Sequence, residues 1–201
     1  MRASLFGLSA LALVAAASPA LAEDAAPFTI TGSAALVSDY RFRGISQSGK
    51  RIAPQASATI THSSGFYASF WSSGIDDYVA SGADAELDLI AGYSKTYSGV
   101  TFDGGLLYYV YPSATKGYNS DFLEIYGSAK SAFGPVTIKG GFAYDPKQKA
   151  LASGTRTKQD NLYLYAEASG AIPGTPFAIA SHLGYSHGPS FLTANSPHYF
   201  D

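Results

Sequence analysis

The stretch that decides the fold is FTITGSAALVSDYRF, residues 28–42, in which apolar and polar side chains alternate. Its even positions are mostly apolar and have aromatic residues at both ends, with Phe28 at one end and Tyr40 and Phe42 at the other. Its odd positions are mostly polar and end in charge at Asp39 and Arg41. A period of two with one apolar face predicts a single strand over residues 28–42, buried on one side only.

The same alternation recurs along the rest of the chain. It is found at residues 55–61, 66–71, 84–93, 100–110, 123–130, 136–145, 162–169 and 177–186, and a further segment begins at Tyr199. The pattern therefore predicts an all-β, antiparallel up-and-down fold with nine strands and the start of a tenth.

The connections between these segments alternate in length. Tight, glycine-ending connections occupy residues 62–65, 97–99, 131–134 and 171–174, whereas longer ones occupy 44–53, 74–82, 112–119, 146–160 and 188–198. Short turns at one end and long loops at the other are typical of outer-membrane β-barrels, whose periplasmic turns are short. A transmembrane β-barrel with a periplasmic N-terminus is the interpretation we favour.

The composition agrees with that interpretation. Only 14% of residues are charged, against about 25% in an average soluble domain, and lipid-facing positions of a barrel exclude charge. The chain has no Cys, which excludes disulfides and thiolate metal sites. A net charge of −2 argues against a nucleic-acid partner.

The first 22 residues have the pattern of a cleavable signal peptide. Arg2 supplies a positive charge, Leu5 to Ala17 an apolar region, and Ala20-Leu21-Ala22 a small-residue cleavage site. We therefore expect residues 1–22 to direct export and residues 23–201 to form the barrel domain. The longest later apolar run, Leu106 to Tyr111, is too short for a membrane-spanning helix.

Residues 37–48, VSDYRFRGISQS, resemble the opening signature of the TorF family of proteobacterial porins. Further matches are GFYA at 65–68, ELDL at 86–89, AGYS at 91–94, YYVYP at 108–112 and FLEIY at 122–126. The resemblance covers about residues 30 to 200. It implies an outer-membrane barrel assigned to transport in a Gram-negative bacterium, and it brings no established site residues or solute.

Members of that family usually continue for several more strands. They end in an aromatic-rich strand that the barrel-assembly machinery binds, whereas this sequence stops at Pro197-His198-Tyr199-Phe200-Asp201. The resemblance therefore predicts a C-terminally truncated sequence and about 12 strands in the complete protein, since bacterial single-chain barrels have even strand numbers.

Charged residues of the polar face are the candidate pore-lining residues. Two groups fall at the outer ends of strands and are expected at similar height in the lumen: Asp39, Arg41 and Arg43, and Asp84, Glu86 and Asp88. Parity places Asp103, Glu124, Lys139 and Glu167 on the same face. The two groups either form a constriction that selects solutes or neutralise each other in a plugged interior. With Asp145 and Lys130 included, eight acidic residues against four basic ones predict weak cation preference.

Other chemistry has weaker support. His62, His182 and His187 lie near serines, but no G-x-S-x-G signature is present, so we expect no enzyme. Asp84, Glu86 and Asp88 are spaced too widely along a strand to share one metal ion, and we expect no metal or cofactor. The basic loop Lys147 to Lys158 is either a lipopolysaccharide contact or a solvated loop.

These observations predict a porin for passive diffusion of small hydrophilic solutes. Its expected partners are outer-membrane lipid, lipopolysaccharide and the barrel-assembly machinery, and its oligomeric state is left open. The alternatives are a non-conducting structural or adhesive barrel and a soluble periplasmic β-barrel that binds a ligand.

Overall fold

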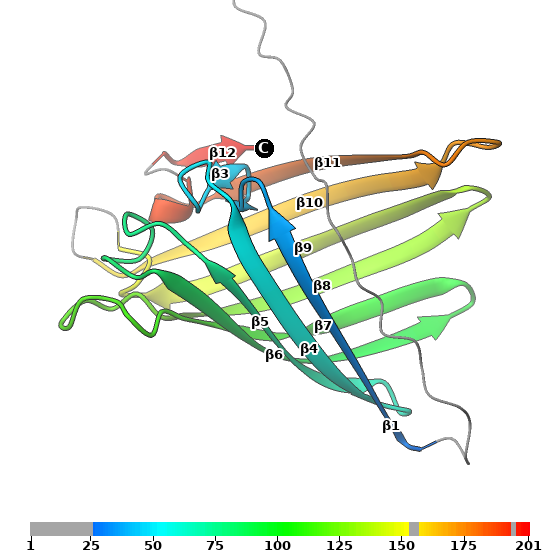
Figure 1. The fold of residues 1–201 in the computed structure, drawn as a ribbon, viewed down its shortest axis with the longest axis horizontal. Helices are drawn as coiled ribbons and strands as arrows, with labels where there is room; N and C mark the ends of the chain where they lie inside the picture. Colours follow the sequence, from blue (N-terminus) through cyan, green and yellow to red (C-terminus); the bar gives the residue numbers. More distant parts are fainter. Residues whose placement is uncertain (1–25, 153–156, 194–195) are drawn as a thin grey trace, which may run out of the picture.

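The computed structural model describes residues 26–152, 157–193 and 196–201, and strands dominate this part of the chain. Ten strands form one antiparallel sheet in which neighbours in the sheet follow one another along the chain (Figure 1). They are β1 (Phe28–Val37), β4 (Ala53–His62), β5 (Phe66–Gly74), β6 (Ala85–Tyr97), β7 (Val100–Val110), β8 (Phe122–Phe133), β9 (Val136–Gln148), β10 (Gln159–Ala171), β11 (Ala178–His187) and β12 (His198–Phe200). The predicted all-β antiparallel class, with nine long strands and a short tenth, is confirmed. The expected signal peptide, residues 1–22, lies outside the described residues.

The prediction of one strand over residues 28–42 is wrong at its C-terminal end. The pairing of β1 with β4 ends at Val37 opposite Ala53. The chain then leaves the sheet and forms a separate hairpin from β2 (Arg41–Phe42) and β3 (Ile45–Ser46). Its two-residue turn has φ of 46° at Arg43 and 75° at Gly44. Positive φ at both central residues is what a tight type I′ hairpin turn requires, and the turn reverses the chain before β1 can extend.

Short turns and long loops lie at opposite ends of the sheet, as predicted. The turns after β4, β6, β8 and β10 are on the right in Figure 1, and the loops after β5, β7, β9 and β11 are on the left. The turn between β6 and β7 consists of Ser98 and Gly99, with φ of 48° and 82°. We call the two ends the short-turn end and the long-loop end.

The two faces of the sheet differ in polarity. The register aligns apolar residues from strand to strand, as where Ile30 lies opposite Ile60 and Leu106 opposite Ile125. Large apolar side chains of this face are exposed in every long strand: Phe28, Ile30, Leu36, Ile60, Phe66, Phe70, Leu89, Phe102, Leu106, Ile125, Ile138, Phe142, Leu164, Ile179 and Leu183. Glu86, Asp88 and Glu124 lie on the other face and are buried. We call these the outer and inner faces.

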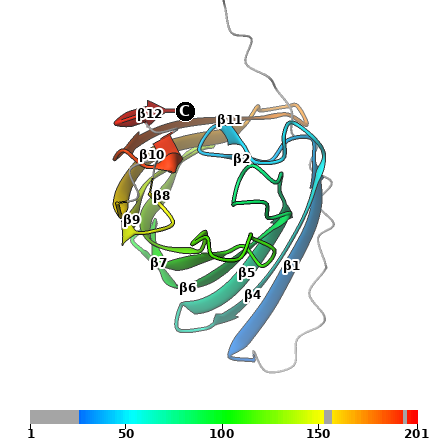
Figure 2. The ribbon, with the colours of Figure 1, turned by 90° about the vertical axis from the view of Figure 1, so that its left-hand side faces the viewer.

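The sheet curls strongly but does not close. Figure 2 shows the strands curving about a common axis, with the hairpin and long loops crossing the long-loop end. Among the described residues, β1 and β12 form the two edges and do not pair with each other. The hydrophobic core, which includes Tyr109, Phe122 and Leu192, contains residues from the sheet and from the long loops. The described residues include no helix long and apolar enough to cross a membrane.

Candidate functional site

The β2–β3 hairpin folds to the inner side of the sheet and extends Arg43 to the wall formed by β8, β9 and β10. The guanidinium donates hydrogen bonds to Glu124 on β8 and to Asn161 on β10, the latter at 2.8 Å. Its Nη1 atom also lies 3.5 Å from an Asp145 carboxylate oxygen on β9. We call Arg43, Glu124, Asp145 and Asn161 the arginine cluster. All four side chains are buried, so the hairpin is held to the wall by charge-assisted hydrogen bonds.

Aromatic rings enclose the arginine cluster. The Arg43 guanidinium carbon lies 4.4 Å from the centre of the Tyr163 ring and 4.8 Å from that of Phe42. Burial alone lowers the pKa of Arg43, but the carboxylates of Glu124 and Asp145 outweigh it and raise the pKa. The guanidinium therefore stays charged at any physiological pH.

A second buried carboxylate, Glu86, is also tied to the polypeptide that crosses the long-loop end. It accepts hydrogen bonds from the hydroxyl of Tyr40 at 2.6 Å and from that of Tyr111 at 2.7 Å. Burial, followed by the negative charge of Glu86, raises the pKa of both tyrosines above the usual value. Asp88, two residues further along β6, has one buried oxygen with no hydrogen-bond partner among the described residues.

The hairpin separates two cavities on the inner side of the sheet. A cavity of about 630 Å³ lies against the inner wall and includes Tyr67, Tyr126 and His182 in its lining. A second one, of about 290 Å³, is lined by loop residues that include Tyr78 and Leu192. Phe42 and Tyr109 line both cavities and contact each other edge to face, with ring centres 5.8 Å apart. The aromatic contact therefore forms part of the partition between the two spaces.

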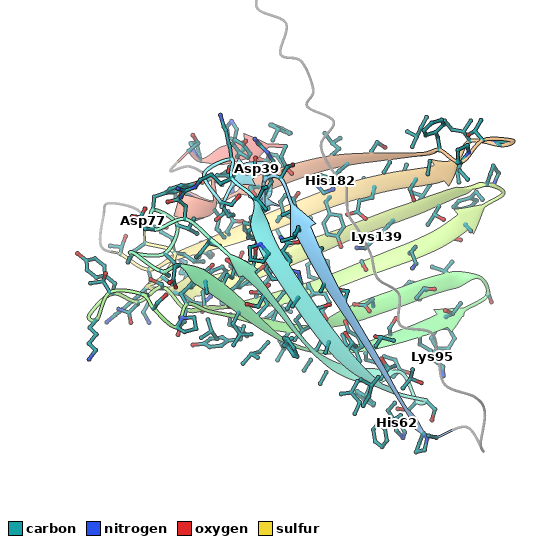
Figure 3. All side chains as sticks on the ribbon, in the orientation of Figure 1. Asp39, His62, Asp77, Lys95, Lys139 and His182 are labelled. Atoms are coloured by element: carbon teal, nitrogen blue, oxygen red, sulfur yellow. The ribbon has the colours of Figure 1, made fainter. Side chains whose placement is uncertain are left out.

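Charged and hydroxyl groups of the inner face lie in the larger cavity and beside it: His182, Tyr163 and Asp201 are part of its lining, whereas Lys139 and Glu167 are not. Lys139 lies 3.7 Å from Glu167, and His182 lies 3.5 Å from Glu167 and 3.2 Å from Asp201. The Tyr163 hydroxyl bonds to His182 at 2.7 Å. Figure 3 shows Lys139 and His182 on neighbouring parts of this wall, while Asp39 lies at the long-loop end and His62 at the short-turn end.

The comparison with known proteins places the chain in one family. A family model described as "Bacterial protein of unknown function (Gcw_chp)" matches residues 21–201. The chain belongs to this family. No curated protein and no solved structure matches it. The resemblance of residues 37–48 to the TorF porins stays a prediction, as does the activity that it implies.

The structure distributes the predicted pore-lining residues over several places. Six of them lie on the inner face of strands: Glu86, Asp88, Asp103, Glu124, Lys139 and Glu167. The others lie outside the long strands. Asp39 and Arg41 are on the stem and first strand of the hairpin, Arg43 is at its turn, and Asp84 is in the loop before β6. The two expected groups do not meet as units. Asp39 pairs with Arg41 at 2.8 Å, and Asp84 accepts a hydrogen bond from Ser113.

Several partners of these charges were not among the predicted site residues. Asn161 completes the arginine cluster, Tyr40 and Tyr111 hold Glu86, and Asp201 joins His182. The inward parity of Asp145 was a usable signal for one member of the arginine cluster. Asn161 was not predicted as a site residue because it precedes the predicted strand 162–169.

The candidate metal-ligating and catalytic side chains can be followed in the described residues. Among the described residues, no group of three or more His, Cys, Asp or Glu side chains is placed to hold a metal ion. His62 bonds to Ser64 at 2.7 Å within an exposed turn. A third group that orients the base, which a nucleophilic triad needs, is not hydrogen-bonded to His62 in the described part of the chain. The basic loop at 147–158 is described only in part, and its Arg156 lies outside the described residues.

Proposed function

We propose that this chain forms most of the wall of an outer-membrane β-barrel that admits small hydrophilic solutes by passive diffusion. One observation carries the membrane assignment: an exposed apolar face runs across all nine long strands, while most of the strands' charges lie on the other face. The long strands have 9 to 13 residues, and about 9 to 11 residues are enough to cross a bilayer with tilt.

The few charges on the outer face of the described strands support this proposal. Lys95 lies two residues before the short-turn end of β6, and Asp160 is the second residue at the long-loop end of β10. Both positions fall where a bilayer gives way to water. A Lys or Arg at the bilayer midplane costs about 2–4 kcal/mol, and the cost falls to about 0–1 kcal/mol near the interface.

We propose that the complete barrel has about 12 strands. At the two edges of the ten-stranded sheet, β1 pairs only with β4 and β12 only with β11 among the described residues. A sheet edge in lipid would expose backbone groups that find no hydrogen bond there, so a membrane wall must close. Bacterial single-chain barrels have even strand numbers, and about 12 is the number that the resemblance to the TorF family implies.

The proposal includes export and assembly. Residues 1–22 would direct secretion, the barrel-assembly machinery would insert the domain, and lipid and lipopolysaccharide would surround it. Short turns would face the periplasm.

For the solute pathway, the supporting observation is the polar inner wall. The cavity of about 630 Å³ lies between the hairpin and the inner face, and its lining includes charged and hydroxyl-bearing side chains such as Glu124, Tyr67 and Thr59. The arginine cluster and the aromatic partition narrow the interior at the long-loop end. Carboxylates outnumber basic groups on the inner face, so we expect a weak preference for cations.

The test is ion conductance of the full-length protein in planar bilayers. We expect small conductance steps in the wild type and a reversal potential that favours potassium over chloride. Arg43→Ala should enlarge the steps, because it removes the anchor of the hairpin, whereas Lys95→Ala, which removes a basic side chain of the outer face, should change them little. A reversal potential that favours anions would contradict the selectivity, and a protein recovered only in the soluble periplasmic fraction would contradict the membrane assignment.

The hairpin itself favours a second candidate, a non-conducting barrel with a structural or adhesive role. A buried cluster that fixes the hairpin across the interior is what a permanent plug needs. A wild-type protein that inserts into bilayers without conducting, combined with an Arg43→Ala variant that also fails to conduct, would favour this candidate.

A further inference from the structure

Two tyrosines of the inner face lie flat against the sheet, because the residues beside them are glycines. Four cross-strand neighbours form a row over β5 to β8, in the order Tyr67, Gly92, Gly105 and Tyr126. A Cβ atom at Gly92 would lie 2.6 Å from the Tyr67 hydroxyl oxygen, and one at Gly105 would lie 2.7 Å from that of Tyr126. Only glycine leaves room for rings this close to the backbone.

Tyr165 on β10 repeats this arrangement. It is opposite Gly141 on β9, where a Cβ atom would lie 2.6 Å from the tyrosine ring. The ring is nearly parallel to that of His182, with the centres 6.1 Å apart and an angle of 19°. The Lys139 ammonium lies 5.0 Å from the ring centre. We call Tyr67, Tyr126 and Tyr165 the wall tyrosines; all three are half-buried.

Hydrogen bonds fix the orientation of the first two rings. The Tyr67 hydroxyl donates to Asp103 at 3.0 Å, and the hydroxyls of Tyr67 and Tyr126 bond to each other. The rings therefore present flat faces in a fixed orientation, with oxygen atoms at their edges. Such preorganisation lowers the entropic cost of binding a rigid ligand.

The charges around the wall tyrosines nearly balance. The larger cavity includes Arg41 and Arg43 against Glu124 and Asp201. An adjoining cavity of about 290 Å³, which shares Tyr126 and Tyr165 with it, adds Lys130 and Lys139 against Asp103, and Lys139 is paired with Glu167. Around the wall tyrosines, in contrast to the inner face as a whole, this balance favours an ion of neither sign, and the charged groups offer many donors and acceptors to a neutral solute with several hydroxyl groups.

We propose that the wall tyrosines form a binding site for neutral saccharides. The C–H faces of a pyranose ring pack on flat aromatic faces, and its hydroxyls take hydrogen bonds from the charged groups beside them. The larger cavity falls within the range of about 300–1,000 Å³ that is usual for small-molecule sites. The inference rests on the proposed function, because saccharides would reach the site by diffusion into the barrel.

The test measures binding of maltose to the full-length protein in detergent micelles by titration calorimetry. Sorbitol serves as the comparison solute, because it carries hydroxyls without a rigid ring face, and choline represents a cation. We expect maltose to bind at least tenfold more tightly than either. Tyr165→Ala and Tyr126→Ala should each weaken maltose binding at least fivefold, and Tyr165→Phe should stay within twofold of the wild type.

Tyr108→Ala is the matched control, since Tyr108 lies on the outer face of β7, and it should leave maltose binding unchanged. Maltose binding no tighter than that of sorbitol in the wild type would overturn the inference without any variant, as would tighter binding of choline. An effect of Tyr108→Ala equal to that of Tyr165→Ala would overturn it as well. Conductance without maltose binding would contradict the saccharide site but not the proposed porin function. Maltose binding without conductance would contradict the porin function but not the saccharide site.

Discussion

Arg43 combines two features that are each unfavourable alone. Its φ of 46° lies in the left-handed region, which costs a non-glycine residue about 1–2 kcal/mol. Its guanidinium is withdrawn from water, with 8% of the residue exposed. The hydrogen bonds to Glu124 and Asn161 and the nearby Asp145 carboxylate offset both costs. The residue is thus held in place by its surroundings and not by its own preferences.

Removing this charge should be far more costly than removing the other arginine of the hairpin. Arg43→Met would leave Glu124 and Asp145 buried without a counter-charge, and we expect a loss of about 3–5 kcal/mol in unfolding free energy. Arg41 forms an exposed pair with Asp39, so Arg41→Met should cost less than about 1 kcal/mol.

The measurement is urea unfolding of the protein in micelles, followed by the fluorescence of Trp71. That residue lies beside Tyr40, with ring centres 5.1 Å apart, and therefore reports on the stem of the hairpin. Equal losses for the two arginine variants would mean that the arginine cluster adds nothing beyond an ordinary surface pair.

For single residues, the sequence predicted which face of the sheet a charged side chain points to better than which residue it pairs with. Parity along a strand places Glu86, Asp88 and Glu124 on the inner face, because successive side chains point to opposite sides. The partner of each charge depends on how the sheet curls and where the hairpin points. Arg43 meets β8 and β10, at separations of 81 and 118 residues, and no local pattern encodes such distances.

The β2–β3 hairpin is the element that the sequence pattern did not predict. Its residues continue the alternation of β1, so Tyr40 and Phe42 look like the aromatic end of one long strand. The turn at Arg43 and Gly44 is the only break, and glycine is common in strands of this chain. By contrast, the tight turn at Ser98 and Gly99 was predicted correctly because it separates two long alternating runs.

Gly44 gives the hairpin a specific test. An added Cβ atom there would lie 2.6 Å from the Cβ atom of Asp201 and would also require a φ of 75°. Gly44→Ala should therefore cost the conformational strain of about 1–2 kcal/mol and, in addition, displace the turn from Asp201. Gly134→Ala is the control, because Gly134 has a φ of 62° and open space around it.

We expect Gly44→Ala to lower the unfolding free energy by at least about 1 kcal/mol more than Gly134→Ala, because both variants carry the strain of a positive φ and only Gly44→Ala adds a steric contact. Limited proteolysis should cut residues 39–50 faster in Gly44→Ala than in the wild type. If the two variants match in stability and cleavage, the hairpin turn is not packed as described.

For the whole molecule, the outer face is the feature to test. Leu106→Lys would place a charge in the middle of β7 on the apolar face, and we expect a loss of about 2–4 kcal/mol in lipid vesicles. Ser128→Lys places the same charge on the inner face opposite Asp103 and should cost less than about 1 kcal/mol. Equal effects would indicate that the outer face meets water instead of lipid.

The strand order and the two ends of the sheet were predictable from the sequence, because each strand pairs with its neighbour along the chain and loop lengths alternate. The curl of the sheet could not be predicted from the sequence. It arises from the twist of each strand and from the packing of Tyr109, Phe122 and Leu192 under the long loops, which bring residues together across many strands.

The contacts of the hairpin also set an order of folding. Pairing of consecutive strands closes short loops, whereas Arg43 can meet Asn161 only after the chain from β4 to β10 has taken its place, 118 residues later. We therefore expect the N-terminal hairpin to be among the last parts to dock, although it is synthesised early. Until β10 is in place, Arg43 lacks some of its hydrogen-bond partners. A docked hairpin therefore indicates that the strands from β4 to β10 have reached their native curvature.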